Sequence, residues 1–149
     1  MTAGYLLDTN VISATAPDRR DVLPPEKAAV RAWMIANEAR LFLSVTAVAE
    51  IAAGIGDREG SGAVRHAREL AAWLASLLGA YPDRVLPFDT EAALHARHLQ
   101  REARGQGMAP SFPDLTIACI ARACGLVVAT RNTRDFTPMG VEVVNPFEV

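Results

Sequence analysis

Short apolar runs alternate along this chain with longer segments in which apolar side chains recur every three or four residues. The short runs, which are typical of buried strands, lie at 5–7, 41–43, 84–86, 126–130 and 141–144. A turn and a small helix are expected after the first run. The longer segments, which have the period of helices, lie at 24–39, 44–56, 61–79, 89–104 and 111–123. This alternation predicts an α/β fold, with a central, mostly parallel, twisted β-sheet flanked by helices on both faces.

Polar residues and glycines mark the expected ends of these helices. Ser44 and Thr46 can cap the helix that begins the 44–56 segment, because their hydroxyls can accept hydrogen bonds from its first N–H groups. Gly54 or Gly56 is expected to end that helix, and Gly125 to end the helix at 111–123.

Composition indicates a single domain over residues 1–149, since half of the residues are hydrophobic and can form a core. Fifteen basic and seventeen acidic residues give a net charge of -2, so nucleic-acid binding would need a local basic patch. Neither a signal sequence nor an apolar segment of the roughly 20 residues that span a membrane is evident. We therefore expect a cytoplasmic protein without a membrane partner. Cys119 and Cys124 are expected to be small buried residues of a reduced protein.

Four acidic residues carry the candidate chemistry, because each interrupts or borders an apolar run, where an unpaired carboxylate is costly. They are Asp8, Glu50, Asp114 and Asp135. Ligands of parallel sheets gather outside the carboxyl ends of the strands, and Asp8 and Asp135 each follow a predicted strand. Asp114 lies in the first turn of its helix. Glu50 has Ala47, Ala53 and Gly54 nearby, which allow its helix to approach the sheet. Together the four predict a site for a hard cation such as Mg²⁺.

Each acid also has a purely structural interpretation. Asp8 and Asp135 can be turn residues, because aspartate hydrogen-bonds to its own backbone. Glu50 can be a solvated charge on a helix. Asp114 can cap its helix and complement the helix dipole. These alternatives stay open on the residues alone, although the combination favours a site.

Several strings of the chain resemble the PIN-domain ribonucleases, especially the VapC-like and FitB-like toxins of bacterial toxin–antitoxin pairs. The resemblance rests on the string 6–13 with its Leu-Leu-Asp-Thr-Asn, the Glu50 helix, Pro113-Asp114 with Ile117-Ala118, and the string 129–136 with its Thr-Arg-Asn-Thr-Arg-Asp-Phe. The steps at 86–89 and 144–147 resemble the FitB-like branch. Together these strings span nearly the whole chain.

The resemblance implies a metal-dependent endoribonuclease in which Mg²⁺, or Mn²⁺ as a substitute, is held by the four acids. Asp8 and Asp114 would be the principal ligands, Glu50 a further ligand directly or through water, and Asp135 the fourth acid. Some relatives place an acid where this chain has Asn132, so either Asn132 or Asp135 completes the site. The polar residues expected to support the acids are Thr9, Asn10, Thr130 and Asn132.

The resemblance also implies partners. RNA is the expected substrate, and Arg131 and Arg134 beside the last motif are candidates for contacts with its phosphates, against the alternative of solvated loop arginines. A homodimer and a cognate VapB-like or FitA-like antitoxin are expected. The helix with Trp33 and Met34 and the apolar stripe at 70–78 offer surface for such contacts, with core packing as the alternative use.

Two other functions compete with the ribonuclease. A haloacid-dehalogenase-like enzyme would use Asp8 as a nucleophile. That chemistry favours a second acid where Asn10 stands, and a lysine near the later acids, whereas Lys27 is the only lysine. A response-regulator receiver meets the same obstacle. The remaining alternative is a catalytically weak PIN-like module that binds a protein partner.

Overall fold

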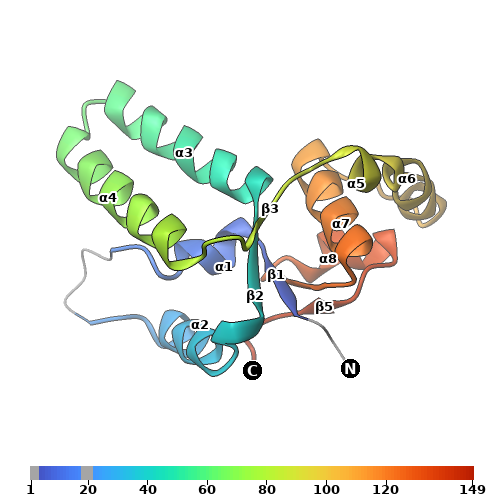
Figure 1. Ribbon diagram of the computed structural model, residues 1–149, viewed down its shortest axis with the longest axis horizontal. Helices are drawn as coiled ribbons and strands as arrows, with labels where there is room; N and C mark the ends of the chain where they lie inside the picture. Colours follow the sequence, from blue (N-terminus) through green and yellow to red (C-terminus); the bar gives the residue numbers. More distant parts are fainter. Residues whose placement is uncertain (1–3, 18–21) are drawn as a thin grey trace.

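The computed structural model describes residues 4–17 and 22–149, and in it five strands form one sheet in the order β3-β2-β1-β4-β5 (Figure 1). All four strand pairs are parallel, so the predicted sheet is confirmed. The strands are β1 (Tyr5–Leu7), β2 (Leu41–Ser44), β3 (Val85–Leu86), β4 (Val127–Ala129) and β5 (Val143–Val144). The strands expected at 84–86, 126–130 and 141–144 are thus shorter than the apolar runs that predicted them.

Helices follow the strands in the expected order. They are α1 (Thr9–Ser13), α2 (Pro25–Ala36), the 3-10 turn η1 (Glu38–Arg40), α3 (Val45–Gly60), α4 (Val64–Ala80), α5 (Thr90–Leu94), α6 (Ala96–Gly105), α7 (Phe112–Cys124), α8 (Thr133–Phe136) and the 3-10 turn η2 (Thr137–Met139). Ser44 caps α3 by accepting a hydrogen bond from the Ala47 N–H at 3.0 Å. Gly125 ends α7 in the left-handed conformation, with φ of 66°.

Several predicted helix ends were wrong. The helix that begins after Ser44 continues through Gly54 and Gly56 to Gly60. A glycine costs only about 1 kcal/mol inside a helix, and the packing of α3 along α4 offsets that cost. The segment 89–104 forms two helices rather than one, with the break at His95. The helix expected at 61–79 begins at Val64, and the one expected at 24–39 stops at Ala36.

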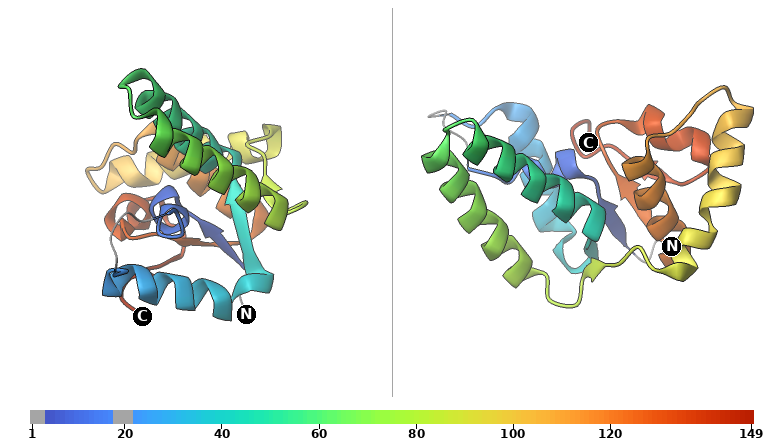
Figure 2. Two further views of the ribbon diagram at one scale, coloured as in Figure 1. Left: turned by 90° about the vertical axis from the view of Figure 1, so that its left-hand side faces the viewer. Right: turned by 90° about the horizontal axis from the view of Figure 1, so that it is seen from above.

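The sheet separates two hydrophobic clusters. Side chains of one strand alternate between them, since Leu6 of β1 packs with α6 and α7, whereas Leu7 packs with α1, α2, α3 and α4. Val128 and Ala129 of β4 divide in the same way. Figure 2 shows the α3–α4 pair and the α5–α7 group on opposite sides of the sheet. Helices therefore cover both faces, as the sequence predicted.

The order of the strands reverses at the centre of the sheet. From β1 the chain moves to β2 and β3 on one side, whereas β4 and β5 lie on the other. Since all strands are parallel, their carboxyl ends meet at one edge, and the point between β1 and β4 is where ligands of such sheets bind. Asp8 directly follows β1 and Thr130 directly follows β4.

Two further expectations concern the cysteines and membranes. Cys119 is buried, as expected, but Cys124 is exposed, because it is the last residue of α7 and lies next to the Gly125 cap. Among the described residues, none of the helices combines the length and the apolar character needed to cross a membrane.

Candidate active site

Asp8 lies at the carboxyl end of β1 and is almost fully buried, with 5% of its surface exposed. It is the N-cap of α1, and its Oδ1 accepts a hydrogen bond from the Thr9 N–H at 2.8 Å. Its Oδ2 accepts from the Thr130 hydroxyl at 2.8 Å and from the Asn10 amide at 3.4 Å. The capping role expected of a turn residue is therefore present, but hydrogen bonds from Thr130, directly after β4, and from Asn10 of α1 also fix the carboxylate at the edge of the sheet.

Thr130 connects the two central strands beneath the site. Its hydroxyl is fully buried, donates to Asp8, and accepts from the Asn132 N–H at 3.0 Å and from the Asn10 amide at 3.5 Å. Asn10 also accepts from the Arg131 N–H at 3.1 Å. The structure thus brings three of the expected supporting residues into one network around Asp8. Asn132 joins it through its backbone, while its side chain is exposed and makes no capping contact to α8.

Glu50 reaches the same edge from α3. Its Oε1 accepts a hydrogen bond from the Thr9 hydroxyl at 2.9 Å, although the residue as a whole is exposed. Thr9 therefore contacts two of the four acids, through its backbone N–H to Asp8 and through its hydroxyl to Glu50. A freely solvated helix charge would not have this partner.

Asp114 lies in the first turn of α7 and is half-buried. Its N–H donates to the Ser111 hydroxyl at 3.2 Å, so Ser111 is the cap of α7 and Asp114 occupies the favourable acidic position next to it. Asp135 lies in the short helix α8, where its N–H donates to the Asn132 carbonyl at 3.0 Å. The sequence had predicted a loop at Asp135.

The charges of neighbouring acids affect the pKa values of Asp8 and Asp114, which indicates that the four acids lie in one region. Burial raises the pKa of Asp8 above its ordinary value of 3.8, the hydrogen bonds from Thr130 and Thr9 lower it, and the charges of Glu50 and Asp135 raise it further. Burial raises the pKa of Asp114 to about 6, with Asp8, Asp135 and Glu50 adding to the increase and Ser111 opposing it. Such acids repel one another until a cation or a proton intervenes.

The donor set fits a hard cation, since all candidate ligands are carboxylate oxygens and the repulsion between them is what a divalent ion relieves. Within residues 4–17 and 22–149, however, no group of three or more His, Cys, Asp or Glu side chains is arranged to hold one metal ion. Magnesium is usually held by only one or two direct carboxylates with several waters. The arrangement therefore suits a site in which two acids bind the ion and the others act through water.

Arg131 and Arg134 are both exposed, Arg131 between β4 and α8 and Arg134 within α8. The Arg131 guanidinium lies over the Phe147 ring, 4.3 Å from its centroid, so the aromatic ring fixes the direction of this side chain. A small hollow of about 350 Å³ is lined by both arginines together with polar residues that include two acids, Asp135 and Glu148. Two cations thus lie next to the acidic edge.

Sequence reasoning missed a hydroxyl pair that links two of the acid-bearing helices. Thr46 of α3 and Thr116 of α7 lie 2.7 Å apart. The Thr116 hydroxyl donates to the Pro113 carbonyl at 2.8 Å, so Thr46 must be the donor in the pair. The expected capping role of Thr46 was wrong, because Ser44 caps α3. Two hydroxyls in otherwise apolar helical segments were the available signal.

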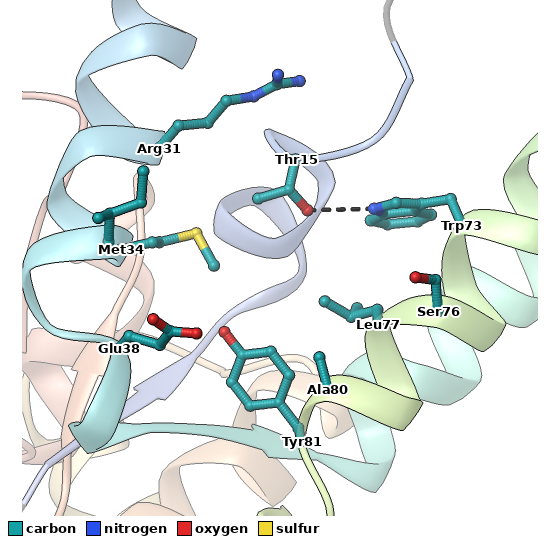
Figure 3. A pocket seen from close by; sticks show the side chains of 10 residues that line it. Thr15, Arg31, Met34, Glu38, Trp73, Ser76, Leu77, Ala80 and Tyr81 are labelled. Atoms are coloured by element: carbon teal, nitrogen blue, oxygen red, sulfur yellow. Dashed lines mark hydrogen bonds between the residues drawn. The ribbon is translucent and has the colours of Figure 1, made fainter.

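A groove opens between α2 and α4 on the side of the sheet that carries α1 (Figure 3). It has a volume of about 410 Å³ and is lined mainly by apolar side chains, among them Met34, Ile35, Trp73, Leu77 and Tyr81. The Trp73 indole donates to the Thr15 hydroxyl at 3.3 Å, which fixes the ring at the rim. The apolar stripe at 70–78 of α4 packs mostly against the core. Across the groove, on α2, Ile35 is 76% exposed.

Known proteins are similar to this chain over nearly its whole length. The family model described as PIN domain matches residues 5–140. The chain is 39% identical to a plasmid stability protein StbB from Pseudomonas syringae pv. tomato, over 96% of this chain and 98% of the relative. It is 35% identical to a VapC ribonuclease from Sinorhizobium fredii, over 96% and 97%. It is 32% identical to the toxin FitB from Neisseria gonorrhoeae, over 95% and 97%.

A solved structure has the same architecture. The crystal structure of FitAcB from Neisseria gonorrhoeae superimposes with a TM-score of 0.81 and 30% identity, and the match covers 97% of this chain and 99% of that chain. The similarity therefore includes the whole sheet and both layers of helices.

Proposed function

The chain belongs to the PIN-domain family, and from this premise we propose that it is an Mg²⁺-dependent endoribonuclease toxin of a type II toxin–antitoxin system. The observation that carries the proposal is the set of four acids at one edge of the sheet, two of which have raised pKa values because of burial and the other acids. The family model and the ribonuclease and toxin names of the relatives support the same function.

The four acids have different roles in this proposal, which follow from their contacts and burial. Asp8 and Asp114 are the principal ligands: Asp8 is buried at the carboxyl end of β1, and the pKa values of both are raised by burial and by the charges of other acids. Glu50, held by Thr9, and Asp135 complete the acidic set. When bound, Mg²⁺, or Mn²⁺ in its place, lowers the pKa of a water and neutralises charge on the scissile phosphodiester.

The supporting residues hold the carboxylates in position. Thr130 and the Thr9 N–H keep both oxygens of Asp8 directed along fixed hydrogen bonds, which favours the ionised form. Asn10 links Asp8 to the backbone of Arg131, so the start of α1 and the turn after β4 stay together. Arg131 and Arg134 are placed to contact phosphates of the RNA strand on the α8 side.

Cleavage of RNA by the purified chain, with and without Mg²⁺ or Mn²⁺, tests the proposal. We expect wild type to cleave only with the metal, and Asp8→Asn to lose activity by about 100-fold or more, because one principal ligand loses its charge. Glu142→Gln is the matched control, since Glu142 is an exposed acid that directly precedes β5 and so lies at the amino end of the strand, away from the carboxyl edge of the sheet. Equal cleavage by wild type and Asp8→Asn under every metal condition refutes the proposed ribonuclease activity of this site.

The protein partner is a cognate antitoxin of the VapB or FitA type, and the groove between α2 and α4 is its docking site in this proposal. Ile35 is exposed there next to the partly buried Trp73 and Leu77, as expected for a surface that an apolar segment covers. We further propose a homodimer that acts in the cytoplasm, where its RNA substrate is found.

A further inference from the structure

A further cavity, of about 380 Å³, adjoins the acidic edge, and Glu50 is the one of the four acids that lines it. Thr9 and Glu50 form part of its wall, and the rest comes mainly from α3 and α4. We call it the α3–α4 cavity, and the residues that matter here are Ile55, Arg58, His66 and Leu70. Any molecule that extends from Glu50 along α3 enters this cavity.

Arg58 supplies a cation to the cavity. It lies two helical turns after Glu50 on the same face of α3, a separation of about 12 Å along the helix axis. Its guanidinium donates to the Gly54 carbonyl at 3.3 Å. Within residues 4–17 and 22–149, no carboxylate lies within ion-pair distance of it. Most of its donors therefore remain available to a ligand.

His66 supplies a second polar group, from the first turn of α4. Its side chain is 17% exposed, and its Nδ1 is buried without a hydrogen-bond partner among the described residues. The nearest acid, Glu69, has its Oε2 at 3.7 Å, beyond hydrogen-bond length. A buried ring nitrogen without a hydrogen-bond partner is unfavourable, and His66 is the second polar group that this wall offers to a ligand.

The remaining wall combines the polar residues Ser13 and Lys27 with apolar side chains. Ile55 is 7% exposed and Leu70 is 8% exposed, and both line the cavity beside the two polar groups. An arginine and a histidine for an anion, next to an apolar wall that includes the Trp73 ring for a flat base, match the two chemical parts of a nucleotide. The net charge of -2 gives the chain no general attraction for RNA, so contacts of this local kind must hold the strand against the acidic edge.

We propose that the α3–α4 cavity binds a nucleotide that flanks the cleaved phosphodiester, with its phosphate against Arg58 and His66 and its base against Ile55 and Leu70. This inference rests on the proposed ribonuclease function, because RNA is the ligand that must pass Glu50 and Thr9. The cavity then determines the length of RNA that is cleaved efficiently. It lies on the α3 side of the acids, whereas Arg131 and Arg134 lie on the α8 side.

Binding of a fluorescent single-stranded RNA of about 12 nucleotides to full-length Asp8→Asn protein measures the contact without cleavage. Adding Arg58→Gln should weaken binding about tenfold and reduce the slope of log affinity against log salt by about 0.7, the value for one phosphate. Adding His66→Phe should also weaken binding. Arg65→Gln is the matched control, because Arg65 is exposed on α4 next to His66 but does not line the cavity. Equal losses for Arg58→Gln and Arg65→Gln overturn the proposal.

Cleavage by protein with an intact Asp8 separates this inference from the proposed function. Arg58→Gln should reduce kcat/KM for the longer RNA and leave that for a dinucleotide unchanged, since the only phosphate of a dinucleotide is the one that is cleaved and none remains to contact Arg58. Normal cleavage of the longer RNA by Arg58→Gln overturns the cavity alone. Absence of any cleavage by wild type overturns the ribonuclease, whereas binding that still depends on Arg58 then supports the cavity as an RNA site.

Discussion

Thr130→Val removes one hydroxyl from beneath the acidic edge while keeping the branched shape of the side chain. Thr130 is fully buried, donates to Asp8 Oδ2 at 2.8 Å and accepts from the Asn132 N–H at 3.0 Å. Its hydrogen bond lowers the pKa of Asp8 against the effect of burial. The valine variant should therefore hold Asp8 in the protonated form up to a higher pH than wild type does.

The magnitude follows from the charge of the acceptor. A hydrogen bond to a charged group contributes about 1.5 to 3 kcal/mol, which corresponds to about a 10- to 100-fold change in an equilibrium. On the acid side of the pH–rate profile, the cleavage rate of Thr130→Val should fall by this factor, because protonated Asp8 does not hold the metal. The acid limb of the profile should move to higher pH.

The assay is the rate of RNA cleavage at fixed Mg²⁺ between about pH 5 and about pH 9. Thr130→Ser is the control, because it keeps the hydroxyl and should keep the acid limb in place despite losing a methyl group. A Thr130→Val profile that coincides with wild type refutes this role of the hydroxyl. A limb that moves equally in the serine variant assigns the effect to packing.

The remaining predictions concern stability, coupling and the partner. Above pH 6, Asp114→Asn should be more stable than wild type by about 1 kcal/mol, a value discounted because the carboxyl is half-exposed. The pKa of the Asp114 carboxyl in the folded protein, about 6, lies above the ordinary 3.8, so wild type loses stability as the pH rises between these two values. Thermal unfolding measures the difference. A variant that is no more stable than wild type at neutral pH contradicts this prediction. Thr46→Val and Thr116→Val should each destabilise the protein, and a double-mutant cycle by urea unfolding should give a coupling of about 0.5 to 1.5 kcal/mol; additive effects would show that the 2.7 Å contact contributes nothing. Ile35→Glu should weaken antitoxin binding about tenfold or more in calorimetry, with the RNA cleavage rate of the isolated chain unchanged; unaltered affinity would place the antitoxin elsewhere.

The sheet and the position of Asp8 could be predicted because they depend on local patterns. Short apolar runs between helical segments are sufficient for a parallel sheet, and the strand-end rule places Asp8 and the loop after β4 at one edge. The helix ends were harder to predict. Gly54 and Gly56 are stop signals only when nothing packs beyond them, and the packing of α3 along α4 was not visible in the sequence.

The contacts between distant segments could not be predicted from spacing. The hydroxyl pair of Thr46 and Thr116 and the unpartnered nitrogen of His66 depend on how α3 lies against α7 and α4. Side chains 70 residues apart meet there, and no periodicity in the sequence encodes that separation. The acids were recognised as a set because each interrupts or borders an apolar run, and the family resemblance then implied their roles. The structure gives the physical link through the effect of the other three acids on the pKa of Asp114.

The location of a bound divalent ion tests the central claim most directly. A crystal grown with Mn²⁺ and measured at the manganese absorption edge would show the ion by its anomalous signal. We predict a peak at the carboxyl edge of β1 and β4, with Asp8 and Asp114 as direct ligands, and no such peak in Asp8→Asn crystals. An ion bound elsewhere, or a peak that persists unchanged in Asp8→Asn, would contradict the assignment of these four acids as the metal centre.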